Sequence, residues 1–252
     1  MEISKDHPRY KSLAIRERMA ELSRRGIVAS TGLIAHGRGE AYDYLLGERT
    51  VREGENAERV AAAYLLEASN PVISINGNAA ALCAEDIISL AKAVPAKMEV
   101  NLFHRSEQRI EAVCSYMESK GANRILGRSP NARLEGIASD RALCTKEGIY
   151  SADVILVPLE DGDRAEALVA AGKVAMAIDL NPLSRTSRTA TVSIVDEVTR
   201  AIPNIERYVS ELRTDPEERR RLIDDFDNQR NLQGVARRMC NNLVGDIDQG
   251  KA

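Results

Sequence analysis

The chain has no tryptophan, and only two phenylalanines and seven tyrosines stand among its 252 residues. Proteins that bind single-stranded nucleic acid stack bases on aromatic rings, so this composition argues against that role. The charge balance agrees, because 35 basic and 38 acidic side chains give a net charge of −3. Nucleic-acid and membrane-surface binders need a field of one sign. We therefore expect neither nucleic acid nor a membrane among its partners.

Long apolar runs are also missing. The longest unbroken run has seven residues, from Val60 to Leu66, whereas a bilayer span needs roughly 20. The first twenty residues contain eight charges and no apolar segment typical of a signal peptide. These features predict a cytoplasmic location.

The cysteines are few and scattered. Cys83, Cys114, Cys144 and Cys240 are separated by about thirty residues or more, and no CxxC pair is present. Zinc sites and disulfide frameworks of small proteins need closer, paired spacings. We expect reduced and mostly buried thiols. Nothing in the sequence resembles a Ser-His-Asp or Cys-His arrangement.

Short apolar segments alternate with helical ones through the middle of the chain. The strand patterns cover residues 71–76, 97–103, 124–126, 153–158, 174–178 and 191–195. Continuous apolar strands that alternate with helices are typical of a parallel sheet covered on both faces. We predict an α/β fold, with a Rossmann-like, doubly wound and mainly parallel sheet over residues 55–212.

Two flanking regions differ from this core. Residues 6–25 have the spacing of an amphipathic helix, and residues 26–54 read as a flexible, glycine-rich loop. Residues 213–252 read as a charged helical tail that begins at Asp215 and Pro216, a capping pair. The prediction is one domain over residues 1–252, with an added N-terminal helix and C-terminal helices.

Polar clusters follow four of the predicted strands, at the edge where parallel sheets bind ligands. The clusters are Asn76-Gly77-Asn78, Asn101, residues 158–164 and residues 179–186. One such cluster is ordinary turn chemistry, but four at one edge predict a site. In the last cluster Asn181, Ser184, Arg185 and Thr186 offer donors, and Arg188 adds a guanidinium fork suited to polyphosphate. Asp179 is placed to bind ribose hydroxyls; a capped loop with solvated arginines is the alternative.

The segment from Gly32 to Glu40 is a near miss to the phosphate-binding pattern GxxxxGK[ST]. Arg38 replaces the lysine and Gly39 the hydroxyl residue, and no clear strand precedes it, so we reject a Walker A loop. No GxGxxG follows the first strand either. A glycine loop that carries His36 and Arg38 remains, with His36 as a general acid or anion donor. A turn without function is the alternative.

Near the end of the fourth strand pattern stand three acids, Glu160, Asp161 and Asp163, and two roles are possible for them. They hold Mg²⁺ through water, since this ion needs few carboxylates, or they cap the helix that begins near Arg164. Two long connections, residues 33–47 and 127–148, are candidate lids.

These motifs resemble those of a known family. They stand in the order His7-Pro-Arg-Tyr10, Gly32-Leu-Ile-Ala-His-Gly-Arg-Gly-Glu40, Asp43-Tyr-Leu-Leu-Gly47, Asn76-Gly-Asn78, Val157-Pro-Leu-Glu-Asp-Gly-Asp-Arg164 and Asp179-Leu-Asn-Pro-Leu-Ser-Arg185. Over residues 6 to 212 the chain is similar to the archaeal phosphopantothenate synthetases, the 4-phosphopantoate–beta-alanine ligases.

The resemblance implies a Rossmann-like homodimer that works in coenzyme A biosynthesis. Such an enzyme joins 4-phosphopantoate to beta-alanine and converts ATP to AMP and diphosphate. The resemblance implies ATP contacts at Arg16, Arg38, Asp179, Leu180, Asn181, Arg185, Thr186, Glu197 and Val198.

The negative charges of the implied substrates are consistent with an arginine-rich site. The two substrates bring together roughly seven negative charges, because a phosphate monoester carries about −1.5 to −2. An acidic protein must offset them locally. The candidates are Arg9, Arg16, Arg38, Arg185 and Arg188, with Mg²⁺ at Asp161 and Asp163 as partner. In this hypothesis Arg16, Arg38 and Arg185 converge on one triphosphate.

The hypothesis assigns catalytic roles to His36, Arg38 and Arg185. The acid substrate contacts Arg9, Asn76 and Asn78, and its carboxylate attacks the α-phosphorus of ATP to form an acyl-adenylate. Two rival functions remain open: an ATP-dependent carboxylate–amine ligase that forms an acyl phosphate, and a nucleotide-sensing module without turnover. Release of AMP indicates adenylation, and release of ADP indicates the acyl phosphate.

Overall fold

Six parallel strands form the central sheet, in the order β3-β2-β1-β6-β7-β8. The computed structural model describes residues 4, 6–7 and 9–248, so both ends of the predicted domain lie outside it. The strands are β1 (Pro71–Ile75), β2 (Lys97–Val100), β3 (Ile125–Leu126), β6 (Val154–Pro158), β7 (Val174–Ile178) and β8 (Val192–Ile194). The predicted Rossmann-like parallel sheet is confirmed.

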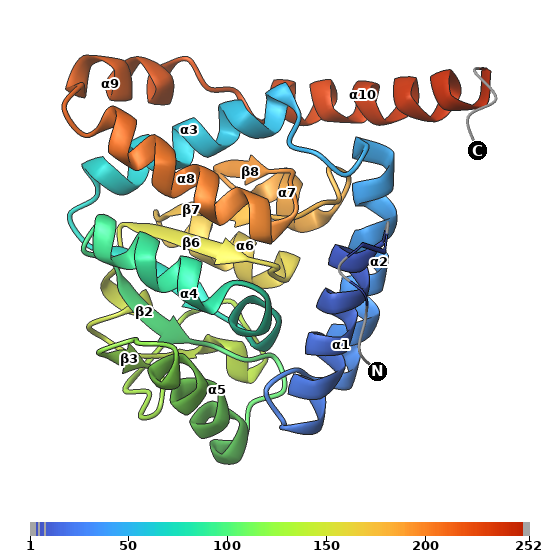
Figure 1. Cartoon of the computed structure of the whole chain (residues 1–252). Coiled ribbons are helices and arrows are strands. Elements are labelled where there is room, and N and C mark those ends of the chain that lie inside the picture. The colour runs from blue at the N-terminus through green and yellow to red at the C-terminus, as the bar shows by residue number, and fades with distance from the viewer. Residues whose placement is uncertain (1–3, 5, 8, 249–252) are drawn as a thin grey trace.

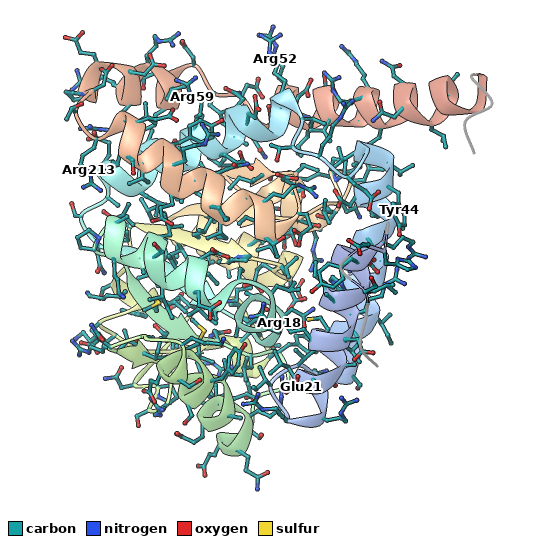
Figure 2. All side chains as sticks on the ribbon, in the orientation of Figure 1. Arg18, Glu21, Tyr44, Arg52, Arg59 and Arg213 are labelled. Atoms are coloured by element: carbon teal, nitrogen blue, oxygen red, sulfur yellow. The ribbon has the colours of Figure 1, made fainter. Side chains whose placement is uncertain are left out.

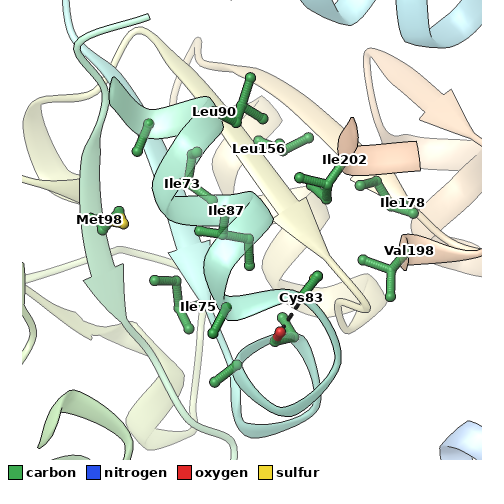
Figure 3. Close-up of a cluster of buried hydrophobic side chains, with 14 of the residues drawn as sticks. Ile73, Ile75, Cys83, Ile87, Leu90, Met98, Leu156, Ile178, Val198 and Ile202 are labelled. Atoms are coloured by element: carbon green, nitrogen blue, oxygen red, sulfur yellow. Dashed lines mark hydrogen bonds between the residues drawn. The ribbon is translucent and has the colours of Figure 1, made fainter. Parts of the chain in front are cut away.

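Helices cover one face of this sheet, where α3 (Arg52–Glu67), α4 (Gly77–Ala93), α5 (Glu107–Ser119) and α8 (Val198–Leu212) pack. The strands need such covers because β1 and β6 are buried along their whole length. Figure 3 shows Ile87 and Leu90 of α4 near Ile73, and Val198 and Ile202 of α8 near Ile178. Helix α4 is kinked at Cys83, whose Sγ contacts the carbonyl oxygen of Ala79 at 3.3 Å.

The other face carries α6 (Gly162–Ala170), α7 (Arg185–Thr189) and a folded segment in place of the expected open loop over residues 127–148. This segment contains the antiparallel pair β4 (Ala132–Arg133) and β5 (Leu143–Cys144) and a short 3₁₀ turn, Asp140–Ala142; a second 3₁₀ turn, Ile149–Ser151, follows it. The buried Glu99 carboxylate anchors it by accepting bonds from the amides of Thr145 (2.6 Å) and Ile149 (2.8 Å). A carboxylate bound by amides holds this segment on the sheet.

The predicted flexible glycine loop is wrong. Residues Ser30–Leu46 form a helix, α2, which stands beside α1 (Tyr10–Arg24). Gly32 allows close packing, because a Cβ there would lie 2.3 Å from Oδ1 of Asn78, whereas a Cβ on Gly39 would make only an ordinary contact with Leu180 at 3.5 Å. Helix α2 ends at Gly47, whose φ of 82° suits glycine.

The C-terminal helices are α9 (Pro216–Asp224) and α10 (Asn228–Asp248). Asp215 caps α9 as predicted, and its carboxylate accepts a bond from the Glu218 amide at 2.9 Å. Val235 and Met239 of α10 are buried in a cluster with residues of α2 and with Val195, which follows β8, and the end of α10 projects from the body (Figure 1). No helix in the described ranges is long and apolar enough to cross a membrane.

Helix α3 carries a buried carboxylate beside Asp196. Glu58 is completely buried; one of its oxygens accepts a bond from Asn204 at 3.3 Å and the other has no partner among the described residues. Burial, and the nearby Asp196 carboxylate, raise the pKa of Glu58 to about 9. Glu58 therefore carries a proton at neutral pH.

We expect Glu58→Gln to stabilise the protein and to flatten its pH dependence. The unfolded glutamate ionises near pH 4.5, whereas the folded one keeps its proton to about pH 9, so wild-type stability falls as pH rises between these values. Glutamine has no proton to lose, and the gain at pH 6.5 is about 2–3 kcal/mol. Urea unfolding from pH 5 to 8 measures it. Glu55→Gln, on the exposed side of α3, is the control. If the free energy of unfolding changed with pH in the same way for wild type and Glu58→Gln, the raised pKa of Glu58 would be contradicted.

Candidate functional site

The chain reverses strand order between β1 and β6, the position where open parallel sheets bind ligands. Asn76 links the two strand ends. Its amide nitrogen donates to the carbonyls of Pro158 (2.8 Å) and Leu159 (2.9 Å), and its oxygen accepts from the Ala79 amide (2.9 Å). Leu159 has a φ of 57°, a strained conformation that concentrates at functional sites. The Asn76 side chain is thus committed to shaping this edge.

Two adjoining cavities lie between α2 and the carboxyl ends of the strands. In Figure 1 the arrowheads of β2 and β6 point toward the side where α1 and α2 stand. The first, which we call the β7-side cavity, has a volume of about 160 Å³, and the second, the β2-side cavity, about 420 Å³. Both are lined by Ala35, Asn78, Leu159 and Asp161. The two cavities therefore share one wall.

Most of the predicted ATP and catalytic positions meet in the β7-side cavity. It is lined by His36, Arg38, Asn78, Asp161, Asp179, Leu180, Asn181, Glu197 and Val198, among others. These residues come from α2, α4 and the ends of three strands, so segments distant in sequence are brought to one place.

Asp179 is fixed at the end of β7. It accepts bonds from the Ser184 hydroxyl (2.5 Å) and the Asn181 amide (3.0 Å). Burial raises the pKa of Asp179, while Ser184, the Asn181 amide and the positive charge of Arg38 oppose the rise. The carboxylate is therefore held rigidly beside a cation.

Glu197 is fixed in a similar way at the start of α8. Its carboxylate caps the helix by accepting a bond from the Thr199 amide at 2.9 Å. Burial raises the pKa of Glu197. Val198 begins the helix, so both residues stand at its first turn inside the cavity.

His36 and Arg38 lie two residues apart on α2 and both line the β7-side cavity. Nε2 of His36 is buried and has no hydrogen-bond partner in the part of the chain that the structure describes. The histidine also borders a small cavity of about 100 Å³ beside α1. Arg38 is exposed, and no ion pair or hydrogen bond joins its side chain to another described residue. Both side chains are available to a ligand.

The structure separates the three arginines that were expected to converge. Of these three arginines, only Arg38 lines either of the two adjoining cavities. Arg16 pairs with Glu40 at 3.1 Å across the α1–α2 contact. Arg185 turns toward α6, where it pairs with Asp163 and lies 3.3 Å from Glu166. Acids on neighbouring helices satisfy these two guanidiniums.

Three other predicted positions are committed elsewhere or stand apart. Arg9 precedes α1, is exposed and does not line either cavity. The buried Thr186 hydroxyl donates to the carbonyl of Glu160 at 2.9 Å. Asn78 does line both cavities, and its nitrogen donates to the carbonyl of Gly32 at 2.8 Å. Its position next to α2 ties α4 to that helix.

The acids proposed as magnesium ligands do not share a site. The Glu160 side chain is 2% exposed and is held between Arg141 and Arg164. Asp161 lines both cavities, whereas Asp163 lines a different cavity beside α6. Among residues 4, 6–7 and 9–248 no three His, Cys, Asp or Glu side chains are grouped to hold a metal. Asp161 alone is positioned in the cleft.

Sequence reasoning missed several basic residues of the site. Arg200 clamps α2 to α8: its guanidinium contacts Asp43 at 3.0 Å and Asp196 at 2.6 Å. The spacing of Asp196 and Arg200, one helical turn apart, is a signal that could have revealed it. Arg141 and Arg109 line the β2-side cavity, and no local pattern marks either one.

Comparison with known proteins adds an independent finding. Residues 53–242 match the family model described as phosphopantothenate/pantothenate synthetase. The chain is 51% identical to a 4-phosphopantoate–beta-alanine ligase of Methanosarcina mazei, over 92% of this chain and 91% of that protein. It is 54% identical to the ligase of the same name from Methanospirillum hungatei, over 84% and 87%. The Thermococcus kodakarensis ligase is 45% identical over 98% and 96%.

Proposed function

Because the chain belongs to the phosphopantothenate/pantothenate synthetase family, we propose that its two adjoining cavities hold the two substrates of one ligation. The protein is a ligase of coenzyme A biosynthesis that joins 4-phosphopantoate to beta-alanine with ATP as co-substrate. In our proposal ATP occupies the β7-side cavity and 4-phosphopantoate the β2-side cavity. The shared wall at Asn78 and Asp161 carries this proposal, because reacting groups must meet there.

The ATP assignment follows from the side chains in the β7-side cavity. Asp179 is a rigid acceptor suited to ribose hydroxyls, and the polar backbone around Asn181 and Val198 lies beside it. Arg38 lines this cavity without an ion-pair partner among the described residues, and a guanidinium binds phosphate oxygens through two donors. Nε2 of His36 adds a hydrogen-bonding atom on the same helix.

The proposed chemistry has two steps. A carboxylate oxygen of 4-phosphopantoate attacks the α-phosphorus, and diphosphate leaves. The beta-alanine amine then attacks the acyl carbon, and AMP leaves with that oxygen. Such transfers depend mainly on positioning and on stabilising developing charge. We assign charge stabilisation to Arg38 and an anion contact to His36, while the Arg200–Asp43 pair keeps their helix in place.

Mg²⁺ fits this cleft at one carboxylate. The ion usually takes one or two carboxylates together with substrate phosphates, and Asp161, half exposed where the cavities meet, supplies one. The ion would neutralise phosphate charge there. We retain Asp161 as its proposed ligand; the position of Asp163 beside Arg185 gives it no part in the same site.

Arg185 reaches ATP in this proposal only by leaving its two acids, Asp163 and Glu166. More than half of its side chain is exposed, so such a movement is sterically open. We expect Arg185→Ala to raise the KM for ATP about tenfold, the lower end of the value of a charged hydrogen bond. Glu166→Gln removes a competing partner and is expected to leave that KM unchanged or lower it. An unchanged KM in Arg185→Ala would remove Arg185 from the site.

Two arginines near the N-terminus, Arg9 and Arg16, are also proposed to contact the substrates. Arg16 pairs with Glu40, which lines the β7-side cavity, so a small movement of α1 would bring it to the phosphates. Arg9 stays a proposed substrate contact.

We also propose a homodimer, supported by the exposed Leu243 and Val244 on the projecting end of α10 (Figure 1).

Product analysis tests the proposed function directly. Protein, ATP, Mg²⁺, 4-phosphopantoate and beta-alanine are expected to give AMP and 4′-phosphopantothenate in equal amounts. ADP in place of AMP would favour the acyl-phosphate ligase. Nucleotide binding without any turnover would favour a sensing module.

A further inference from the structure

Arg109 is a cation without an acid partner in the β2-side cavity. Its guanidinium, on α5, donates to three backbone carbonyls, those of Gly26 (3.3 Å), Ile27 (3.2 Å) and His104 (2.5 Å). No carboxylate of the described residues pairs with it, and burial lowers the pKa of Arg109. Its charge is therefore fixed in place and available to an anion.

Arg141, from the folded segment over residues 127–148, lines the same cavity. Its side chain is only 4% exposed and pairs with Glu160, while Nη1 donates to the carbonyl of Asn101 at 2.9 Å. Its Nε has no hydrogen-bond partner, although an Asp161 oxygen lies 3.4 Å away. Arg164 binds the same Glu160 carboxylate. Two buried guanidiniums thus share one acid.

Both cavity arginines are tied to the short segment after β2. Arg141 holds the carbonyl of Asn101, and Arg109 holds that of His104. Between these points Leu102 and Phe103 line the cavity with apolar side chains, and His104 also faces it. The cavity therefore has the Arg109 guanidinium beside the segment after β2, an apolar wall, and Arg141 next to Asp161 on the wall shared with the β7-side cavity.

We infer that Arg109 binds the phosphate monoester of the acid substrate and makes the enzyme select the phosphorylated acid. This inference rests on the proposed function. 4-Phosphopantoate has a phosphate at one end, a dimethyl-substituted carbon in the middle and a carboxylate at the other end. With the phosphate on Arg109, the dimethyl group meets Leu102 and Phe103, and the carboxylate reaches the wall shared with the ATP cavity, where Arg141 and Asp161 stand.

The test compares 4-phosphopantoate with unphosphorylated pantoate in three proteins: wild type, Arg109→Met and Arg105→Met. Arg105 is the matched control, because it also donates to a backbone carbonyl, that of Gly127 at 2.8 Å, but does not line the cavity. Arg109→Met is expected to lower kcat/KM for 4-phosphopantoate about 10- to 150-fold, the value of a charged hydrogen bond. Its kcat/KM for pantoate and its KM for ATP stay near those of wild type, and Arg105→Met keeps the wild-type preference.

A structural role for Arg109 would lower activity on both acids equally, and that result would overturn the inference. So would a wild type that does not distinguish the two acids. Because Arg109→Met can fail to fold, a second measurement uses wild type alone. Inorganic phosphate is expected to compete with 4-phosphopantoate and not with ATP; competition with ATP alone, or none, would overturn the inference. Failure of the proposed function is distinct, since wild type would then release no AMP with either acid.

Discussion

Replacement of Glu160 by glutamine is expected to reduce the free energy of unfolding by about 3–5 kcal/mol, the usual cost of removing one partner of a buried ion pair. The Glu160 side chain is 2% exposed, and its two arginine partners are 4% and 1% exposed. Glutamine keeps the size but loses the charge, so Arg141 and Arg164 remain buried without an acid between them. The nearby Asp161 is half exposed and contacts only Arg141.

Urea unfolding followed by circular dichroism measures this loss. Glu147→Gln is the control, because Glu147 pairs with Arg124 at the surface, where both side chains are well exposed. Such pairs contribute about 0–1 kcal/mol. An equally small loss of unfolding free energy in the two variants would show that the ion pairs of Glu160 with Arg141 and Arg164 are not essential for stability.

Replacement of Arg38 by alanine is expected to lower kcat/KM for ATP about 10- to 150-fold, or about 1.5–3 kcal/mol, while the fold is retained. Arg38 is exposed on α2 and lines the β7-side cavity without a protein partner, so its loss affects ligands and leaves no buried group unpaired. Arg38→Lys keeps the charge but not the two-pronged donor, and is expected to recover only part of the activity.

Steady-state kinetics at varied ATP measures the effect of Arg38→Ala. Arg52→Ala is the control, since Arg52 stands on the outer end of α3 and points away from the body (Figure 2). Wild-type kinetics in Arg38→Ala would place the triphosphate elsewhere. A loss of kcat with unchanged KM would assign Arg38 to the transition state alone.

The sheet could be predicted from the sequence because each strand carries its own signal. The segment Val154–Pro158 is a continuous apolar run, and burial of its whole length is the physical reason for that run. The polar ends of these strands predicted Asp179, Asn181 and Asn78 in one place, since parallel strands end at the same edge.

The helix α2 could not be predicted because its glycines act through tertiary contacts. A local reading takes Gly32 and Gly39 as sources of flexibility. The structure instead uses the missing side chain of Gly32 to bring α2 against Asn78. His36 and Arg38, the residues that the prediction placed on a loop, line the β7-side cavity from a helix.

The arginines show a second limit of local patterns. A strong motif ends at Arg185, and the family resemblance implies Arg16, yet Asp163 and Glu40 on other helices hold these arginines outside the cavities. Arg109 and Arg141 have no motif, and only folding brings them to one cavity. Pairing in space decides which of many similar guanidiniums is available to a ligand.

Transfer of oxygen between the substrates tests the central claim most directly. 4-Phosphopantoate labelled with ¹⁸O in its carboxylate is converted with ATP and beta-alanine, and the products are analysed by mass spectrometry. Attack of that carboxylate on the α-phosphorus, across the wall shared by the two cavities, predicts one ¹⁸O atom in the AMP. Label in inorganic phosphate, or unlabelled AMP, would contradict it.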